Sequence, residues 1–168
     1  MATGQKKPRI IAGEAGGRRL AVPAGERVRP TSDRVKESVF SALGPERLVG
    51  ARVLDLYAGS GALGLEALSR GAAGAVLVER DATAARAIRT NIDTLGFGDR
   101  AVLRVAAVGS VLGGSPPSEQ FDLALLDPPY DTPDTELEDV LRLLLGGGWV
   151  DGDATVVVER AAGSAPVR

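Results

Sequence analysis

The sequence predicts an α/β fold, a doubly wound and mostly parallel sheet with helices on both faces, and three observations predict it. From residue 52 onward, apolar runs alternate with segments of helical periodicity. The apolar runs are continuous rather than interleaved with polar residues, which is typical of parallel strands buried on both faces. A glycine-rich turn follows the first run directly, as it does in Rossmann-like domains.

The segment before residue 52 is predicted to hold a small β-hairpin and one helix. Residues 9–22 fit two short strands around a Gly-Gly turn. Residues 31–43 fit a helix that begins after a proline, with Thr31 as its N-cap. The apolar face of this helix is predicted to consist of Val35, Val39, Phe40 and Leu43.

The rest of the chain is predicted to contain five strands and three longer helices. The strands are expected at residues 52–59, 75–81, 101–107, 121–130 and 154–160. The helices are expected at residues 61–71, 82–95 and 134–145. Residues 109–120 are predicted to be mainly loop. Because ligands of such folds bind at the carboxyl ends of the strands, candidate site residues are those that directly follow each strand.

Length and composition indicate one globular domain of ordinary type. The chain has 168 residues, of which 44% are hydrophobic and 25% charged. It contains no cysteine and no histidine. This excludes a disulfide framework, a thiolate nucleophile, a Cys/His zinc site, a Ser-His-Asp triad and imidazole catalysis. What remains is chemistry carried out by carboxylate, lysine or tyrosine side chains, by a metal held by carboxylates, or by a cofactor.

Two further expectations come from the ends and the charge of the chain. No apolar run approaches the roughly 20 residues that span a bilayer, and the start lacks a signal-peptide core, so we expect a cytoplasmic protein. The first 36 residues carry nine Lys or Arg against three Asp or Glu, whereas the remainder carries eleven against nineteen. A basic arm, residues 1–30, on an acidic domain, residues 31–168, indicates a polyanionic partner.

The first motif is DLYAGSGALG, residues 55–64, at the end of the first strand. Gly59, Gly61 and Gly64 match G-x-G-x-x-G, where glycine lets the backbone approach a ligand at a helix N-terminus. Glu79 ends the second strand, and a carboxylate there can accept hydrogen bonds from both hydroxyls of a ribose. The motif therefore predicts binding of an adenosine-containing cofactor, although such a turn also serves tight helix–strand packing.

That cofactor can be NAD or S-adenosylmethionine, and Asp55 favours the second. Asp55 precedes Gly59 by four residues, where its carboxylate can hold the ammonium of a methionine moiety. Tyr57 and Ser60 belong to the same loop and are further candidate cofactor residues. No residue pattern points to a bound metal.

The second motif, Asp127-Pro128-Pro129-Tyr130, follows the fourth strand. The exocyclic amine of a base is a poor nucleophile because its lone pair is delocalised into the ring. The Asp127 carboxylate and the Pro128 carbonyl can each accept one amine N–H, and the two prolines fix the backbone that places them. Tyr130 can stack on the extruded base, worth about 1–3 kcal/mol. Together with the first motif, this predicts methyl transfer to an amino group of a nucleic acid base.

At this point the chain resembles a known family, the bacterial guanine-N2 methyltransferases of small-subunit (16S) ribosomal RNA, or RsmD-like methyltransferase D family. The two motifs above are shared with many amino-methyltransferases. More particular to the family are RIIAGEAGGRRLAVP (residues 9–23) and VRPTSDRVKESVF (residues 28–40). The resemblance covers nearly the whole chain.

The resemblance implies a class I methyltransferase fold and methylation of a guanine N2 amine, in an assembled or assembling 30S subunit. It assigns S-adenosylmethionine to the loop at Gly59, Ser60 and Gly61 and to Glu79. It assigns the target amine and catalysis to the Asp127–Tyr130 motif. Contacts with RNA are expected from the arm and from the start of the following helix, namely Arg9, Arg18, Arg19, Arg29, Thr31 and Arg34. We expect a monomer.

The sequence departs from the family at two places. Many relatives have a polar residue after strand three, whereas this chain has Ala106-Ala107-Val108, so backbone groups such as those of Ala107 would hold adenine. Relatives also continue into an antiparallel hairpin beyond strand five, and the chain ends at Arg168. We expect the hairpin to be missing and strand five to form an open edge.

Three alternatives remain open from the sequence. A DNA adenine-N6 methyltransferase uses the same Asp-Pro-Pro-Tyr motif, although such an enzyme usually carries an extra recognition domain. A NAD-dependent oxidoreductase shares the glycine-rich turn but leaves that motif unexplained. A binding module without turnover would not require Asp127 and Tyr130.

Overall fold

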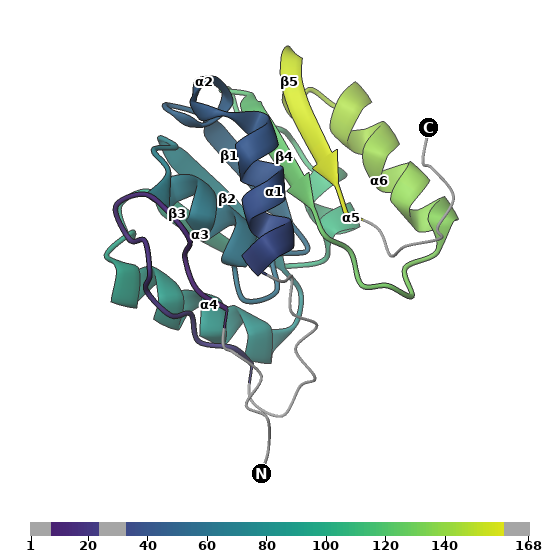
Figure 1. Ribbon diagram of the computed structural model, residues 1–168. Helices are drawn as coiled ribbons and strands as arrows, with labels where there is room; N and C mark the ends of the chain where they lie inside the picture. The colour runs from purple at the N-terminus through teal and green to yellow at the C-terminus, as the bar shows by residue number, and fades with distance from the viewer. Residues whose placement is uncertain (1–7, 24–32, 160–168) are drawn as a thin grey trace.

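The computed structural model describes residues 8–23 and 33–159 and contains one parallel sheet between two layers of helices (Figure 1). Its strands are β1 (Arg52–Leu56), β2 (Gly74–Glu79), β3 (Ala101–Val105), β4 (Phe121–Leu126) and β5 (Val150–Val158). Its helices are α1 (Asp33–Leu43), α2 (Pro45–Leu48), α3 (Ala62–Ser69), α4 (Ala82–Leu95), α5 (Val108–Leu112) and α6 (Asp134–Gly146).

The strand order is β3-β2-β1-β4-β5, and every neighbouring pair is parallel. From β1 the chain moves outward to β2 and β3, then returns to the other side of β1 as β4 and β5. The order therefore reverses between β1 and β4, which is the position where doubly wound sheets bind ligands. This confirms the predicted Rossmann-like fold class.

Two hydrophobic clusters cover the two faces of the sheet. On one face, helices α1 to α4 pack with the N-terminal segment, residues 8–23, against side chains such as Val53 and Leu77. On the other face, α5 and α6 pack against side chains such as Leu54 and Val78. The continuous apolar runs of the sequence are explained by this burial on both faces.

Helix α4 shows how local signals set an element's bounds. The Asp81 side chain accepts a hydrogen bond from the N–H of Ala84 at 2.8 Å and so caps the first turn. Gly96 ends the helix in the left-handed conformation, with φ of 73°. The predicted bounds, 82–95, are confirmed. The short helix α2 was not predicted, because its single turn begins at Pro45 without an apolar period.

Helix α1 forms within the predicted range, but one part of its predicted face is wrong. Phe40 and Leu43 are buried as predicted, and Val39 is half-buried. Val35 is 41% exposed, whereas Lys36 beside it is fully buried. The helix therefore buries a different face from the predicted one, because polar contacts described below hold Lys36 in the interior. The predicted cap, Thr31, lies outside the described residues.

The predicted strands of the N-terminal hairpin are reduced to a single antiparallel bridge between Arg9 and Arg19. The reason is that the backbone N–H groups of the turn bind α3 instead of a partner strand. Ile11 and Ala12 donate to the Glu66 carboxylate, and Ala15 donates to the Ser69 hydroxyl. The segment is therefore fastened as an irregular loop, with Ile10, Ala15 and Leu20 buried in the core.

The outer strands of the sheet are β3 and β5. Strand β5 begins at Val150, earlier than predicted. In the described part of the chain β5 pairs only with β4 and forms an edge. None of the described helices is long and apolar enough to cross a membrane.

Candidate functional site

The loop between β1 and α3 is shaped by three residues with positive φ: Tyr57 at 62°, Gly59 at 62° and Gly61 at 85°. Glycine adopts this conformation without strain, whereas tyrosine rarely does. A side chain at Gly59 would meet open space, so its conformation, not packing, requires glycine. The predicted helix N-terminus is present, because Gly61 is the residue immediately before α3.

Gly64 is required for the tight packing of a helix on a strand, which the sequence analysis gave as the other possible role of the glycine-rich turn. A Cβ at this position would lie 2.9 Å from Oδ2 of Asp55 and 3.1 Å from the Leu77 side chain. Only glycine lets α3 approach β1 and β2 so closely. Of the three glycines of the motif, Gly64 thus fixes the helix, and Gly59 and Gly61 shape the loop.

Glu79 holds this loop from the end of β2. Its Oε1 accepts a hydrogen bond from the N–H of Gly59 at 2.9 Å, and its Oε2 accepts one from the N–H of Asp81 at 2.9 Å. The side chain is half-buried at the carboxyl edge of the sheet. The structure thus brings together Glu79 and Gly59, two residues that the sequence analysis assigned to the same cofactor.

Asp55 is buried beneath the same loop, 1% exposed. Its Oδ2 accepts a hydrogen bond from the N–H of Gly64 at 2.9 Å, whereas no donor among the described residues reaches its buried Oδ1. Burial raises the pKa of Asp55 to about 8, and the nearby negative charges of Asp127 and Glu79 add to the effect, while the Gly64 hydrogen bond opposes it. An anionic Asp55 would therefore need a cation beside Oδ1.

The raised pKa makes a prediction for stability. A carboxyl group whose pKa is higher in the folded than in the unfolded state favours folding at low pH. This contribution is lost as the pH rises from about 4 towards 8. Asp55→Asn keeps an acceptor for Gly64 and does not titrate. Its free energy of unfolding minus that of the wild type should rise with pH, by up to about 1.4 kcal/mol per unit.

Urea unfolding of both proteins at pH 5, 6, 7 and 8 measures this difference. Asp122→Asn, which changes an exposed carboxylate on β4 to an amide, is the matched control. If the Asp55 difference varies with pH no more than the Asp122 difference does, Asp55 is ionised throughout this range.

Tyr57 contributes an apolar surface rather than an acid–base group. Its ring packs against the cluster under α5 and α6, and its hydroxyl is buried without a hydrogen-bond partner among the described residues. Burial, together with the charge of Glu136 and against that of Arg80, raises the pKa of Tyr57 to about 12. The phenol therefore stays neutral at any physiological pH.

The Asp-Pro-Pro-Tyr motif leaves the sheet beside this loop. Because Leu56 of β1 pairs with Leu126 of β4, the residues that follow both strands emerge at one edge. Asp127 is half-buried, Pro128 is buried, and Pro129 and Tyr130 are exposed, Tyr130 to 74%. The carbonyl of Pro129 accepts a hydrogen bond from the N–H of Thr132 at 2.9 Å, which closes the turn. The two motifs are thus brought together.

Ala107 follows β3 at the same edge. Its carbonyl accepts the N–H groups of Ser110 and Val111, both at 3.1 Å, and so begins α5. The N–H of Ala106 donates to the carbonyl of Glu79 at 3.1 Å, which joins the ends of β3 and β2. The carbonyl of Ala107 is thus engaged in the helix. Within the described part of the chain, no cluster of three or more acidic residues could hold a metal ion.

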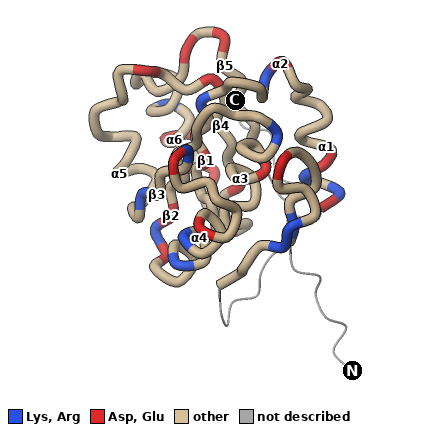
Figure 2. The backbone as a smooth tube through the Cα atoms, turned by 90° about the vertical axis from the view of Figure 1, so that its left-hand side faces the viewer, with Lys and Arg blue, Asp and Glu red and all other residues tan. Residues whose placement is uncertain are grey.

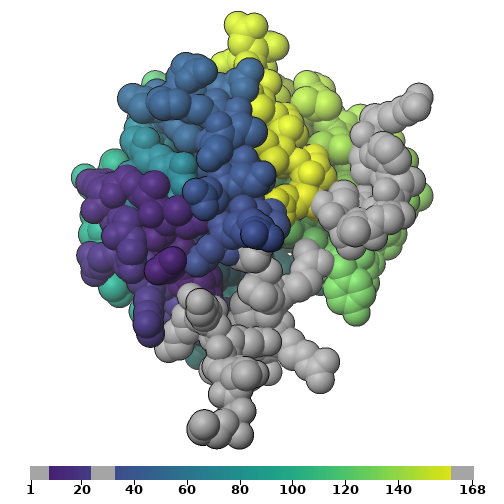
Figure 3. All heavy atoms as spheres, viewed as in Figure 1, coloured from purple at the N-terminus to yellow at the C-terminus, as the bar shows by residue number. Residues whose placement is uncertain are grey.

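Of the predicted RNA-contacting residues, Arg9, Arg18 and Arg19 lie on the N-terminal segment and Arg34 lies on α1, and these two elements lie side by side (Figures 2 and 3). Arg9 is paired with Asp33 at 3.3 Å and is 60% exposed. Arg18 donates to the carbonyl of Thr94 at 2.7 Å, at the end of α4. Arg19 and Arg34 are exposed. Arg29, like Thr31, lies outside the described residues.

Sequence reasoning missed the polar groups that fasten this segment. Glu66 is fully buried in α3, and its carboxylate accepts from Arg70 at 2.8 Å and lies 3.4 Å from Nζ of Lys36. Lys36 also donates to the carbonyl of Arg9. Burial lowers the pKa of Lys36, and the charges of Glu66 and Asp33 oppose this effect. The sequence did offer one signal of this buried role, because Glu66 is a carboxylate in the otherwise apolar helix α3.

Asn91 of α4 was also missed. Its side chain is 2% exposed and bonds both the N-terminal segment, at Ala21, and the loop after β1, at Ser60. In the sequence it stands on the apolar face formed by Ile88, Ile92 and Leu95. A polar residue at such a position is a signal of a buried hydrogen-bonding role.

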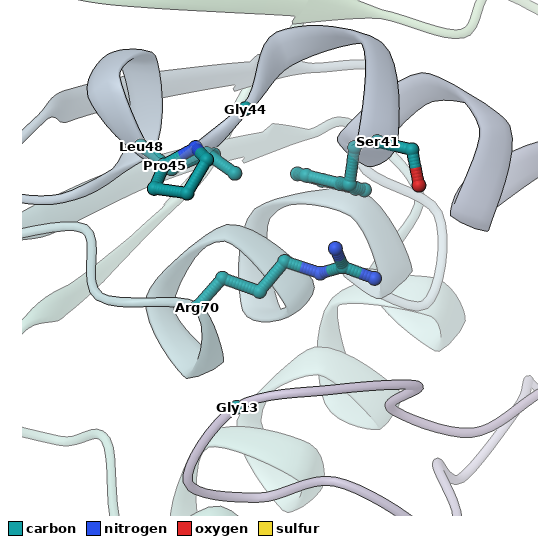
Figure 4. Close-up of a pocket in the computed structure, with 7 residues that line it drawn as sticks. Gly13, Ser41, Gly44, Pro45, Leu48 and Arg70 are labelled. Atoms are coloured by element: carbon teal, nitrogen blue, oxygen red, sulfur yellow. The ribbon is translucent and has the colours of Figure 1, made fainter.

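A pocket of about 300 Å³ lies away from these motifs (Figure 4). It is formed where α1 ends, along α2 and at the end of α3, and is lined by Gly13, Phe40, Ser41, Gly44, Pro45, Leu48 and Arg70. Since α3 starts at the carboxyl edge of the sheet and runs to the opposite edge, its last turn is remote from Gly59 and Asp127. We therefore place the functional site at the carboxyl edge.

A parallel 3-2-1-4-5 sheet with a glycine loop after β1, a carboxylate after β2 and Asp-Pro-Pro-Tyr after β4 defines a class I methyltransferase fold. Residues 8–167 match the family model described as conserved hypothetical protein 95. The chain belongs to this family, that of the methyltransferase D proteins.

Individual relatives agree with this assignment. The chain is 40% identical over 157 residues to ribosomal RNA small subunit methyltransferase D of Escherichia coli K12, covering 94% of this chain and 76% of the relative. It is 39% identical over 153 residues to the protein of the same name from Haemophilus influenzae, covering 90% and 77%. The solved structure of the Escherichia coli protein yhhF superposes with a TM-score of 0.82 at 40% identity, covering 94% and 83%.

Proposed function

We propose that this protein transfers a methyl group from S-adenosylmethionine to the N2 amine of a guanine in small-subunit ribosomal RNA. The observation that carries the proposal is the position of Asp127 and Pro128 beside the glycine loop, at the point where the strand order reverses. The names of the relatives support ribosomal RNA as the substrate class.

The buried Oδ1 of Asp55 fits the methyl donor. An ammonium group beside this atom would supply the cation that the buried carboxylate needs, and would lower the pKa of Asp55. NAD offers no ammonium for this position. S-adenosylmethionine would thus place its methionine part near Asp55 and the loop of Tyr57, Gly59, Ser60 and Gly61.

The adenosine part would extend from Glu79 towards Ala107. Glu79 already accepts two backbone N–H groups, and each carboxylate oxygen has a second lone pair for a ribose hydroxyl. The Ala107 carbonyl is engaged in α5, so the adenine ring would meet the N–H of Ala107 or neighbouring apolar groups.

When bound, the donor supplies a methyl group on a positively charged sulfur, which leaves as a neutral thioether. Asp127 and the Pro128 carbonyl would each accept one N–H of the amine, which directs the nitrogen lone pair towards the methyl carbon. Asp127 would then take the proton that the nitrogen loses when the new C–N bond forms. Tyr130, largely exposed beside them, would stack on the base.

The direct test uses radiolabelled S-adenosylmethionine and small ribosomal subunits from a strain that lacks the activity. We expect the label in N2-methylguanosine after nucleoside analysis. Parallel reactions with protein-free 16S RNA and with DNA distinguish an assembled or assembling 30S particle from naked RNA and from a DNA substrate. Label in N6-methyladenine of DNA alone would replace the proposal by the adenine alternative. Sedimentation of the protein tests the monomer.

Neutralising Arg18 and Arg19 as glutamines should weaken RNA binding and flatten its salt dependence. Loss of two phosphate contacts should reduce the slope of log K against log salt by about 1.4 to 1.8. Titrations of RNA with the protein, at KCl concentrations between about 50 and 200 mM, measure the slope.

The matched control neutralises two exposed arginines elsewhere, Arg47 on α2 and Arg142 on α6. It changes the net charge equally and should leave the slope almost unchanged. Equal slopes in the two variants would mean that RNA contacts another surface.

A further inference from the structure

Asn91 connects two parts of the molecule that the proposed function uses separately. Its Oδ1 accepts the N–H of Ala21 at 2.6 Å, and its Nδ2 donates to the Ala21 carbonyl at 3.0 Å. The same Nδ2 donates to the carbonyl of Ser60 at 2.9 Å. One buried amide therefore binds the N-terminal segment on one side and the glycine loop on the other.

An amide is the side chain that this position requires. It must accept one N–H and donate to two carbonyls, and a neutral amide offers one acceptor oxygen and two donor hydrogens. A carboxylate would satisfy Ala21 N–H but would face two carbonyl oxygens without a donor. An apolar side chain would leave three backbone groups of Ala21 and Ser60 without their hydrogen-bond partner, and a buried polar group that stays unpaired destabilises the fold.

The contact with Ser60 has a specific consequence for the loop. Glu79 fixes the loop at the Gly59 N–H, and Asp55 fixes its end at the Gly64 N–H. Asn91 fixes the carbonyl between these two points. Because Gly59 and Gly61 flank Ser60 and give the backbone unusual freedom, this hydrogen bond restricts the Ser60 peptide of the loop that we assign to the donor.

We propose that Asn91 is a positioning residue that couples the docking of the N-terminal segment at Ala21 to the affinity for the methyl donor. The inference rests on the proposed function, since it assumes that the loop at Ser60 binds the donor. Coupling between two sites is reciprocal, so donor binding also stabilises the docked segment. RNA that engages the arginines of this segment and donor at the loop then favour each other's binding.

The test compares Asn91→Ala and Asn91→Asp with a matched control, Ser69→Ala. Ser69 is also buried and also bonds the segment twice, accepting from Ala15 N–H at 2.9 Å and donating to the Ala12 carbonyl at 2.6 Å. It contacts the segment far from the loop. Calorimetry with S-adenosylhomocysteine measures donor-site affinity, and thermal unfolding measures stability.

We expect both Asn91 variants to bind S-adenosylhomocysteine at least about tenfold more weakly, the effect of one lost hydrogen bond of about 1.4 kcal/mol. The KM for the donor should rise while kcat at saturating donor stays near the wild-type value. Ser69→Ala should lose stability and keep its affinity within about twofold. Equal affinities of the Asn91 variants and the wild type would overturn the inference.

Hydrogen exchange on the unmodified protein decides the matter if the Asn91 variants do not fold. Added S-adenosylhomocysteine should slow exchange of the Ala21 N–H, which Asn91 binds, and should not change that of the Ala15 N–H. Equal changes at both amides would show a general stabilisation and no coupling through Asn91. A wild type that binds no S-adenosylhomocysteine would instead contradict the proposed donor site itself.

Discussion

Replacing Asp127 with alanine should lower the rate of methyl transfer at least about a hundredfold. The effect has the size expected when a group that orients and stabilises the reacting atoms is removed. Asp127 emerges from β4 beside the glycine loop and is held there by buried Pro128, so its carboxylate is placed before substrate binds. Single-turnover methylation of small ribosomal subunits, with donor in excess, measures this rate.

Binding of S-adenosylhomocysteine should be largely preserved in the same variant, because Asp127 is assigned to the target amine and not to the donor. Asp131→Ala is the matched control, an exposed aspartate four residues further along the same turn. It should methylate within about twofold of the wild type. Wild-type turnover by Asp127→Ala would remove this residue from the catalytic assignment.

Glu66→Ala should destabilise the protein by about 3–5 kcal/mol, the usual cost of breaking a buried ion pair from one side. The substitution leaves fully buried Lys36 without its carboxylate and removes the acceptor of the Ile11 and Ala12 N–H groups. Since a typical domain is stable by only about 5–15 kcal/mol, urea unfolding should show a large shift of the midpoint.

The control is Glu14→Ala, which removes an exposed ion pair with Arg100 and should cost less than about 1 kcal/mol. A second variant, Glu66→Gln combined with Lys36→Met, removes both charges together. It should recover part of the loss, because the fully buried charge of Lys36 is removed together with that of Glu66, although Arg70 still loses its carboxylate partner. A Glu66→Ala midpoint equal to that of Glu14→Ala would show that water or other groups compensate Lys36.

The elements that the sequence predicted well are those whose signals are local. Helix α4 has its cap, its apolar period and its final glycine within 16 residues, Asp81 to Gly96. The strands are continuous apolar runs that need no distant partner to be recognised. The position of the candidate site at the carboxyl edge of the sheet followed from the predicted strands, because the residues after β1, β2 and β4 of a parallel sheet must emerge on the same side.

The errors arise where distant contacts decide the outcome. Lys36 is buried because its partner Glu66 comes from another helix, and Val35 is turned outward in consequence. The N-terminal strands are replaced by bonds to α3, 54 and 55 residues away in the sequence. The burial of Asp55 and the raised pKa that it causes depend on how closely α3 packs at Gly64. No periodicity in the sequence encodes such distances.

The way the N-terminal segment is fastened has a consequence for its evolution. Glu66, Ser69 and Asn91 bind its main chain, at the N–H groups of Ile11, Ala12, Ala15 and Ala21, and do not select the side chains there. Exposed positions such as Arg19 can therefore change without loosening the attachment, with Gly13 as an exception, since any Cβ there would overlap Ser69. The charge of this surface, which we propose to contact RNA, can therefore diverge between lineages while the anchoring residues stay fixed.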